Sequence, residues 1–540
     1  MSADTYTVGD EHRGACFVCS GNHSQSQLNG RDRRRFLSQA ASASLASVGI
    51  TSGLLSASAP ALADKHKAVK VAADLGDEFV VEAGWALVVN AGELELLADA
   101  SVLVRSGVIH EIRSKPIPGN MPRIREPGHL LVPGFISGHT HVCSATPTRG
   151  IIEGPRSYIR PLELVEKLSN DELDALTAFN LAELLRSGCT TQVEMSLSLR
   201  QAESYVRVAS EWGVRGYPGS MIPDISRLAA VWFRSTDQVL WDSESETLRE
   251  IAANLEFGKK HMGSGNGRIL PMMAPHAADT QTEATMKAIA DASRELGTGL
   301  HIHLSQSSGE TQTIRRLWGK TPTQWLQEFG FFEAPVFGAH MSGLDWDVDP
   351  AILNRYGVVY SHCPSGGGAG GGTQPYPEAL GAGMRVNIGI DTHSNDYVED
   401  LKLAVLLGQA RFELLHSKSR VPIKNPTIWS AIKGATLIAA EGLRRQDLGR
   451  IAPGARADLV SIDVSGLLVG SGSRPPEPLN NLLYANGKMV RHVMTDGRLQ
   501  ILDGKLTVDD ESKVLLNGGQ VVDKIWTQLA EEGWFTPTPR

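Results

Sequence analysis

The chain contains few cysteines, no excess of basic residues and no long uninterrupted apolar run. Only 5 of its 540 residues are cysteine, and two of these, Cys16 and Cys19, lie in the leader described below. Cys143, Cys189 and Cys363 are too few for a disulfide framework. A formal net charge of -8 offers no basic footprint for nucleic acid. A disulfide-stapled scaffold and a nucleic-acid-binding protein are therefore disfavoured.

The first 63 residues are predicted to be an export signal. Residues 32–37 read Asp-Arg-Arg-Arg-Phe-Leu and resemble a twin-arginine motif. A weakly apolar run follows at about residues 39–59, and residues 61–63, Ala-Leu-Ala, form a small-x-small cleavage site. The run is too polar for a membrane span. We expect the twin-arginine export machinery as a partner and a periplasmic or extracellular location; the alternative is a disordered basic tail.

Between residues 132 and 446, short apolar runs alternate with longer helical patterns, such as 171–187, 281–296 and 398–416. Eight successive β/α units predict a (β/α)8 TIM barrel in the α/β class. The eight predicted strands are 132–138, 189–195, 212–221, 268–275, 299–304, 335–340, 357–362 and 386–391.

The segments that flank this barrel have a different pattern. Residues 102–109 read as a strand, a turn and a second strand, and residues 449–460 and 489–502 also have β character. The stretch from residue 64 to 131 is too short for a large core of its own.

In (β/α)8 barrels, catalytic side chains lie at the carboxyl ends of the strands. The polar residues that end the predicted strands should therefore form one chemical set. Six of the eight predicted strands contribute histidines or an aspartate to this set. These residues are His139, His141, His276, His301, His303, His340, His362, Asp391 and His393. Two imidazoles at alternate strand positions, as in His139 and His141, share a face and can hold one divalent metal.

Residues 132–141, V-P-G-F-I-S-G-H-T-H, resemble the opening signature of the amidohydrolase superfamily. The motifs at 188–191, 275–276 and 361–364 follow the order and spacing of its cytosine deaminase-like and triazine hydrolase branch. The resemblance covers the whole mature chain. It implies that residues 64–131 and 447–540 pair into one small discontinuous β-sandwich beside the barrel.

The resemblance assigns His139, His141, His303 and Asp391 as ligands of one divalent metal ion. Three imidazoles and a carboxylate suit zinc, the first choice, or iron(II), with an open position for water. Asp391 would also accept a proton from the attacking water. His301 lies on the same strand face as His303 and remains the alternative ligand.

A second metal is not expected. Two-metal relatives use a bridging carboxylated lysine near the end of the fourth strand, and residues 268–280 and 212–221 contain no lysine. Glu194 is the one obvious acidic bridge if a second ion binds.

By the same resemblance, His276 contacts the substrate and His340 polarises the attacked centre or holds the hydroxide. Gln306 departs from the pattern, because deaminases carry a proton-shuttling glutamate there. A neutral amide can form hydrogen bonds but cannot shuttle a proton. His393 is a candidate substitute acid or base. The glycine-rich stretch 365–372 suggests either room for a large or flexible substrate or a surface linker.

We therefore expect a metal-dependent hydrolase that attacks a non-peptide C–N bond of a small molecule: an amide, a cyclic amide or a heterocyclic amine. The alternative keeps the metal centre for lactone or ester hydrolysis, hydrolytic dehalogenation or decarboxylation. A metal-bearing binding protein without catalysis is a third interpretation. The sequence leaves open the substrate and whether the chain forms a homo-oligomer.

The export signal can be tested directly. Replacing Arg33 and Arg34 together with lysine should trap the precursor in the cytoplasm, because the twin-arginine route requires both guanidinium groups. Cell fractionation and N-terminal sequencing measure the outcome, with a mature N-terminus near Asp64 expected. An exported product that still carries Arg33 would contradict the prediction.

Overall fold

The computed structural model describes residues 75–151, 159–232, 244–369, 372–470 and 472–535. The predicted export signal lies outside these residues. All described residues belong to one compact unit of the chain.

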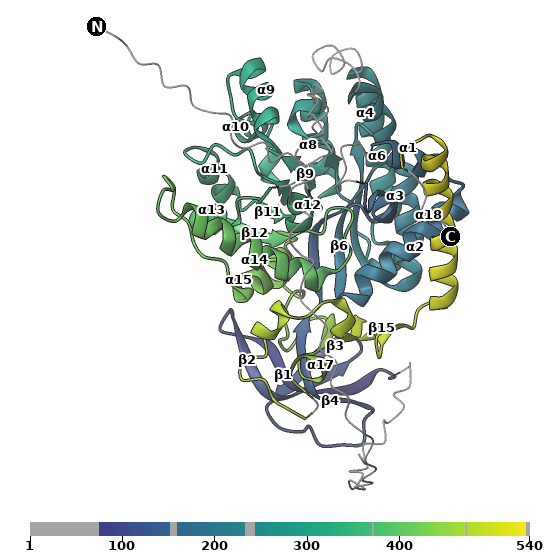
Figure 1. Ribbon diagram of the computed structural model, residues 1–540, viewed down its shortest axis with the longest axis vertical. Helices are drawn as coiled ribbons and strands as arrows, with labels where there is room; N and C mark the ends of the chain where they lie inside the picture. The colour runs from purple at the N-terminus through teal and green to yellow at the C-terminus, as the bar shows by residue number, and fades with distance from the viewer. Residues whose placement is uncertain (1–74, 152–158, 233–243, 370–371, 471, 536–540) are drawn as a thin grey trace, which may run out of the picture. The chain divides into compact units, whose positions relative to one another are not determined.

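Eight short parallel strands form the predicted barrel (Figure 1). They make two four-stranded sheets, in the orders β5-β6-β7-β8 and β9-β10-β11-β12. Isolated bridges join both seams: Met273 and Ala277 pair with β9, and Thr140 pairs with Asp391 beyond β12. The strands are β5 (Phe135–Thr140), β6 (Cys189–Ser196), β7 (Arg215–Ile222), β8 (Ala274–Pro275), β9 (Leu300–Leu304), β10 (Val336–His340), β11 (Val359–His362) and β12 (Arg385–Ile388). The (β/α)8 prediction is confirmed.

Most of the predicted strands differ from the observed ones by one to three residues at an end, and two differ more substantially. The run 132–138 is divided between two sheets, because β4 (Arg123–Pro133) ends at a proline and β5 begins after Gly134. A Cβ at Gly134 would lie 2.2 Å from Thr190 Oγ1, so only glycine lets the chain pass there. Of the run 268–275, only two residues form a regular strand, since prolines at 271 and 275 remove backbone donors.

The three named helical patterns are confirmed, and each helix begins at a side-chain cap. Ser169 and Glu172 form a capping box at α2, Thr282 caps α8, and Asp396 accepts from the Glu399 N–H at α14. The main helices of the barrel are α2 (Asn170–Arg186), α3 (Leu199–Trp212), α6 (Glu244–His261), α8 (Glu283–Leu296), α9 (Ser308–Trp318), α11 (Asp349–Tyr356) and α14 (Tyr397–Leu415).

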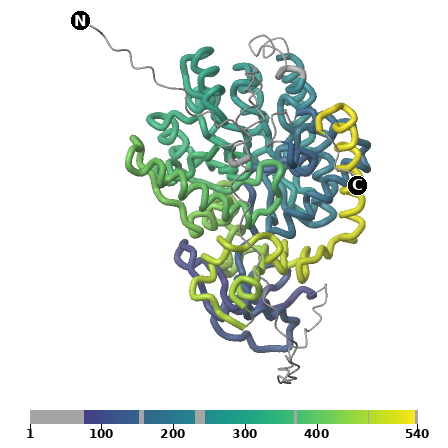
Figure 2. The backbone as a smooth tube through the Cα atoms, in the orientation of Figure 1, coloured from purple at the N-terminus to yellow at the C-terminus, as the bar shows by residue number. Residues whose placement is uncertain are grey.

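A second, eight-stranded sheet combines the two ends of the described chain. Its order is β16-β15-β14-β13-β4-β1-β2-β3, so the early strand β4 lies directly between β1 and the late strand β13. Figure 2 shows these purple and yellow-green segments side by side. The strands are β1 (Glu78–Asn90), β2 (Glu93–Arg105), β3 (Val108–Arg113), β4 (Arg123–Pro133), β13 (Leu459–Asp463), β14 (Val490–Thr495), β15 (Arg498–Leu502) and β16 (Lys505–Leu506).

The β character predicted for residues 449–460 is wrong for most of that range. Turns, bends and irregular backbone occupy 449–458, apart from one isolated bridge between Arg456 and Val108, and β13 begins only at Leu459. Gly449 and Gly454 adopt positive φ angles of 64° and 86°, which a continuous strand does not allow. The predictions for 102–109 and 489–502 are confirmed.

The helix α18 (Glu511–Glu531), near the C-terminus, is not among the elements predicted from the sequence. Its buried face packs against α2, where the Lys524 ammonium pairs with Glu172 at 2.6 Å. The indole N–H of Trp526 donates to the Pro147 carbonyl at 3.1 Å. The chain therefore returns to the barrel after completing the sheet.

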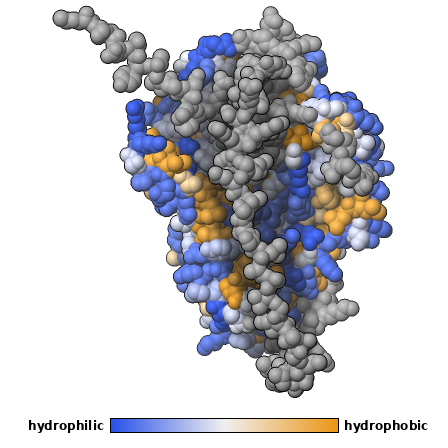
Figure 3. Space-filling view, in the orientation of Figure 1, coloured by the Kyte–Doolittle hydropathy of each residue, from blue (hydrophilic) through white to orange (hydrophobic). Residues whose placement is uncertain are grey.

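Polar residues predominate on the coloured part of the face in Figure 3, with separate hydrophobic patches between them. Leu414, Leu467 and Tyr484 are among the large apolar side chains that remain exposed. Within the described ranges, no helix is both long enough and apolar enough to cross a membrane.

A buried ion pair joins the barrel to the second sheet. Arg215, on β7, contacts Asp458 Oδ2 at 3.0 Å through Nε and Asp496 Oδ1 at 2.9 Å through Nη2. Only 3% of the Arg215 side chain is exposed. Arg268 also contacts Asp496, at 2.7 Å.

Replacing Arg215 with methionine should lower the free energy of unfolding by about 3–5 kcal/mol, because two largely buried carboxylates lose a shared counter-charge. The matched control is Arg207→Met, since Arg207 forms a 2.7 Å pair with Asp174 but is 45% exposed. That change should cost no more than about 1 kcal/mol. Denaturant unfolding measures the free energy of unfolding of both variants. Equal losses would contradict a larger stabilising contribution from the buried ion pairs of Arg215.

Candidate metal centre

The two ends of the barrel sheet meet at a seam that brings His139, His141 and Asp391 together. The Asp391 N–H donates to the His139 carbonyl at 3.0 Å, and the His141 N–H donates to the Asp391 carbonyl at 3.0 Å. Asp391 Oδ1 then lies 3.7 Å from His139 Nε2 and 3.6 Å from His141 Nε2. Asp391 adopts a φ of 66°, a left-handed conformation that is costly for a non-glycine residue and concentrates at functional sites.

The strand β9 adds His303 to this seam. Its Nε2 lies 3.4 Å from His141 Nε2, and the ligand atoms of His139, His141 and His303 all lie within 4.8 Å of one another. His139, Asp391 and His340, at the end of β10, form a second group within the same limit. The structure thus gathers all four predicted metal ligands.

His301, the alternative ligand, belongs to neither group. It points instead toward β7, where a Cβ built on Gly219 would lie 3.3 Å from its Nε2. His303 is therefore the residue of β9 that the geometry places with His139 and His141.

Hydrogen bonds fix which ring nitrogens face the centre. The His141 Nδ1–H donates to the Met195 carbonyl at 2.6 Å, and the His303 Nδ1–H donates to the His276 carbonyl at 2.8 Å. Each bond leaves Nε2 unprotonated and directed at the cluster, which is the usual outer-shell arrangement of a metal-binding histidine. Burial lowers the pKa of His141 to about 4 and that of His303 well below its usual value, so both rings are neutral.

The cluster fits a cation. Within the described residues, His139 Nε2 and Asp391 Oδ1 have no hydrogen-bond partner although both are buried. Buried polar atoms without partners are rare because each loses its bonds to water. A divalent ion among neutral imidazoles and a carboxylate would satisfy them together.

Gln374, which was not predicted from the sequence, orients His340. Its Oε1 accepts from the Cys363 N–H at 2.8 Å, so its amide nitrogen faces His340 Nδ1 at 3.1 Å and donates to it. The proton of neutral His340 therefore lies on Nε2, which is buried without a partner among the described residues. Burial lowers the pKa of His340 to about 3. His340 consequently presents an N–H donor to the centre.

Gln306 lies just beyond β9 with its side chain buried. Its backbone N–H donates to Glu310 Oε2 at 2.6 Å, and Glu310 Oε1 accepts from the Ala278 N–H at 3.3 Å. Burial, reinforced by nearby Asp279, raises the pKa of Glu310 well above its usual value. Glu310, also missed from sequence, thus ties the segments after β8 and β9 together.

His276 and His393 border the cluster but belong to neither group of ligand atoms. The His276 ring centroid lies 5.1 Å from that of His303. The His393 ring is buried, its nitrogens have no partner among the described residues, and its carbonyl accepts from Arg149 Nε. Both remain available as substrate contacts.

Glu194, the suggested acidic bridge, is already occupied. It accepts from Thr140 Oγ1 at 2.7 Å, from the Val142 N–H at 3.0 Å and from Ser196 Oγ at 2.8 Å. Burial raises its pKa to about 7. Glu194 therefore anchors the segment that carries His141, and it does not join either group of candidate ligand atoms.

A cavity of about 10 Å³ adjoins the cluster, which is room for about one water molecule. Its lining comprises His141, Ser144, Leu162, Leu197, Met221, Ile225, His303 and Thr392. The glycine-rich stretch after β11 was expected to leave room for a large substrate, but Gly366, in α12 (Pro364–Ala369), has no free space beside it. A Cβ at this position would lie 2.4 Å from Asp391 Oδ2. This glycine instead lets the backbone pack against the carboxylate.

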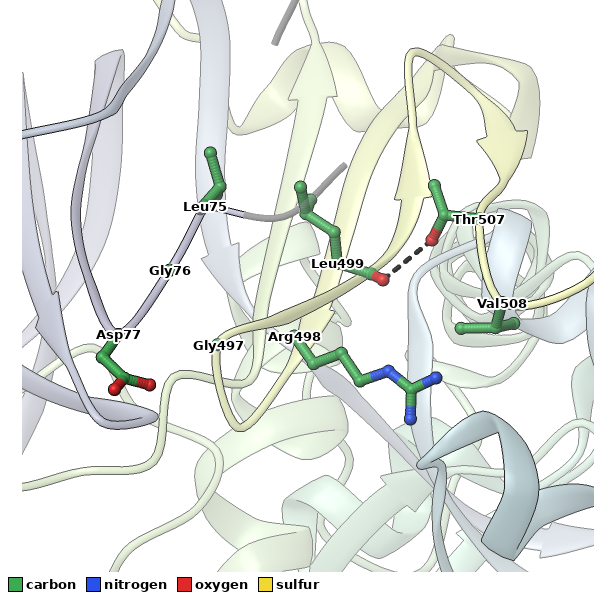
Figure 4. A pocket seen from close by; sticks show the side chains of 8 residues that line it. All are labelled: Leu75, Gly76, Asp77, Gly497, Arg498, Leu499, Thr507 and Val508. Carbon is green, nitrogen blue, oxygen red and sulfur yellow. Dashed lines mark hydrogen bonds between the residues drawn. The ribbon is translucent and has the colours of Figure 1, made fainter. Parts of the chain in front are cut away.

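A larger cavity of about 590 Å³ adjoins the eight-stranded sheet (Figure 4). Thr507 Oγ1 donates to the Leu499 carbonyl at its edge, at 2.8 Å. Its lining residues include Asp77 and Arg498 but neither histidine nor cysteine. This cavity lacks the donor set of the candidate metal centre.

A barrel with a histidine-rich candidate metal centre at the carboxyl ends of its strands has the arrangement expected of a metal-dependent hydrolase. The amidohydrolase family profile matches residues 130–500, and the chain belongs to this family. It is a hydrolase acting on carbon–nitrogen bonds other than peptide bonds.

Two relatives in sequence are named as deaminases. The chain is 29% identical over 397 residues to a 5-methylthioadenosine/S-adenosylhomocysteine deaminase of Desulfitobacterium hafniense, covering 72% of this chain and 84% of the relative. It is 28% identical over 409 residues to a 5'-deoxyadenosine deaminase of Methanopyrus kandleri, covering 73% and 86%.

Solved structures share the fold. An adenosine deaminase from Xanthomonas campestris with bound zinc superposes with a TM-score of 0.66 at 22% identity, covering 83% of this chain and 98% of its own. The atrazine chlorohydrolase TrzN from Arthrobacter aurescens TC1, complexed with zinc, gives 0.68 at 18% identity, covering 82% and 100%.

The choice between His303 and His301 gives a sharp test. His303→Gln should remove one equivalent of bound divalent metal per chain, because it deletes one of three converging imidazoles. His301→Gln, two positions away on the same strand, should retain that equivalent. Metal analysis of the two purified variants beside the wild type measures the difference. Loss of the ion in His301→Gln alone would reverse the assignment.

Proposed function

We propose that the chain hydrolyses a non-peptide C–N bond of a small heterocyclic molecule at one divalent ion. The ligands would be His139, His141, His303 and Asp391, and zinc suits this donor set. The observation that carries the proposal is their convergence, with the Nδ1–H groups of His141 and His303 tied to carbonyls. The deaminase relatives support the bond type, and the zinc-bearing structures support the choice of metal.

A divalent zinc ion at such a position supplies a Lewis acid that can lower the pKa of water to about 7. Asp391 would accept the proton that the attacking water gives up. His340 would donate its Nε2–H to the charge that develops at the attacked centre, a role that Gln374 supports by occupying Nδ1. His276 and His393 would contact the substrate.

The leaving group distinguishes this chain from a deaminase with a glutamate at position 306. Gln306 has no proton to shuttle, and His340 has its second nitrogen occupied by Gln374, so the imidazolium that a proton shuttle requires is disfavoured. His393 is then the remaining candidate acid, and a leaving group that needs little protonation suits the site best. An activated amine on an electron-poor ring, or a strained cyclic amide, meets this condition.

Hydrolytic dehalogenation is kept only as an additional activity of the same C–N hydrolase centre, because a halide leaves without a proton and Gln306 would not impede it. The lactone, ester and decarboxylation alternatives gain no support from the relatives. Export through the twin-arginine route remains part of the proposal.

The function is tested by measuring ammonia, amine and halide release from a panel of heterocyclic amines, cyclic amides and halogenated heterocycles. We expect metal-dependent turnover of an activated C–N substrate, and poor turnover of cytosine, guanine and adenosine-type substrates. Gln306→Glu should improve the latter by restoring a proton shuttle. Efficient wild-type deamination of an unactivated base would contradict the leaving-group argument.

On the best substrate of that panel, Gln306→Ala should lower kcat/KM by the equivalent of only about 0.5–1.5 kcal/mol, because it removes one hydrogen bond that positions the substrate. His340→Ala should lower turnover by roughly 10²–10³-fold, the range for loss of one hydrogen-bond donor that stabilises the developing charge. Steady-state kinetics of both variants, with bound metal measured in each, separates the two effects. Equal loss in the two variants would give Gln306 a catalytic role.

A further inference from the structure

We propose a second divalent-metal site, distinct from the candidate metal centre, formed by Glu126, His129 and His492 in the eight-stranded sheet. Their ligand atoms, one per residue, all lie within 4.8 Å of one another. His129 and His492 are buried, and Glu126 is half-buried, so a small cation can reach the group from one side. Two imidazoles and one glutamate form a donor set that zinc binds in proteins.

The local backbone explains how the three side chains meet. Residues 126 and 129 are an odd number of positions apart, so a regular strand would place them on opposite faces. The pairing of β4 with β1 is interrupted here: Ala83 faces Glu126 but Trp85 faces Leu130, which leaves extra residues on β4. Such bulges re-aim side chains and recur beside functional sites.

A glycine makes this interruption possible. A Cβ at Gly84 would lie 2.3 Å from the Pro127 carbonyl oxygen, and a Cβ at Gly128 would lie 2.2 Å from Ser465 Oγ. Position 84 therefore needs glycine for the backbone to pass, whereas at position 128 the close contact is with a serine hydroxyl that can rotate away. The bulge turns Glu126 toward His129, while His492 reaches the same group from β14, two strands away across β13.

The separations suit a shared ion. His492 Nε2 lies 3.0 Å from Glu126 Oε1, and His129 Nε2 lies 3.4 Å from Glu126 Oε2. Ligands about 2.0–2.1 Å from a tetrahedral zinc are about 3.3 Å apart, which falls between these values. The 3.4 Å separation is longer than an ordinary N–H···O bond, so a direct hydrogen bond accounts for only one of the two contacts.

An outer partner also orients His129. Its Nδ1 lies 2.8 Å from Ser461 Oγ, on β13, which can accept the Nδ1–H and leave Nε2 unprotonated for a metal. On His492, the Asp503 N–H donates to Nδ1 across a long 3.4 Å, which places the proton of the neutral ring on Nε2. Zinc at Nε2 therefore requires this long bond to break and the proton to move to Nδ1. The rival arrangement is a metal-free triad in which His492 Nε2–H donates to Glu126.

An ion at this position would join β4, from the early part of the chain, to β14, from the late part. These strands belong to one sheet but are separated by the whole barrel in sequence. Its contribution would be to stability rather than to turnover, because a ligand that binds the folded state alone stabilises it.

The test adds zinc alone to the full mature chain carrying His303→Gln. This substitution removes the zinc that the candidate metal centre would bind, so the remaining bound zinc can be counted separately. After chelation and dialysis, this protein should bind one equivalent of zinc and its melting temperature should rise. Adding Glu126→Gln or His492→Gln should abolish both effects. Adding His110→Gln, an exposed histidine on β3 of the same sheet, should leave both unchanged.

Circular dichroism before zinc addition identifies any variant that fails to fold; the half-buried, nearly isosteric Glu126→Gln is the safer of the two. No zinc bound in the His303→Gln background would overturn the proposal, as would equal zinc binding with and without Glu126→Gln. The metal-free triad is then the correct description. Neither outcome bears on the candidate metal centre, which is tested by the equivalent that His303→Gln itself removes.

Discussion

The structure depends on two backbone hydrogen bonds at the barrel seam, between Asp391 and the two histidines that flank Thr140. Each is 3.0 Å long, and together they place three side chains from opposite ends of the barrel sequence around one point. Because the pairing is between backbones, the side chains need no direct bond to one another. At this position Asp391 adopts a strained left-handed backbone conformation, with a φ of 66°.

Burial then sets the chemistry of the cluster. The buried imidazoles of His141 and His303 stay neutral. Their Nδ1–H groups donate to the carbonyls of Met195 and His276, respectively, so their Nε2 lone pairs converge. Glu194 holds the backbone next to His141, and Gln374 holds the proton of His340 on Nε2. The residues that surround the cluster thus determine which ring nitrogen each histidine directs toward its centre.

The barrel and the set of polar residues at its strand ends were predictable because the relevant signals are local, whereas the choice of the four candidate ligands from that set came from the family resemblance. A polar residue at the end of an apolar run marks a strand end, and parallel strands bring those ends to one rim. The division of residues 132–138 between two sheets was not predictable, since Pro133 and Gly134 also fit a single strand. The helix α18 was missed because its segment was read only as part of the flanking β structure.

Gln374 and the group around Glu126 escaped the sequence analysis for a different reason. Gln374 acts through a residue 34 positions earlier, and Glu126 meets His492 from 366 positions away. No periodicity relates such positions, and the bulge that turns Glu126 toward His129 reverses what strand alternation predicts. Tertiary pairing alone reveals these residues.

Anomalous X-ray diffraction at the zinc edge, from crystals of the zinc-loaded protein, tests the central claim most directly. The account predicts a peak about 2.0–2.2 Å from Nε2 of His139, His141 and His303 and from a carboxylate oxygen of Asp391. A peak bound by His301 instead, or two ions at the seam bridged by Glu194, would contradict it.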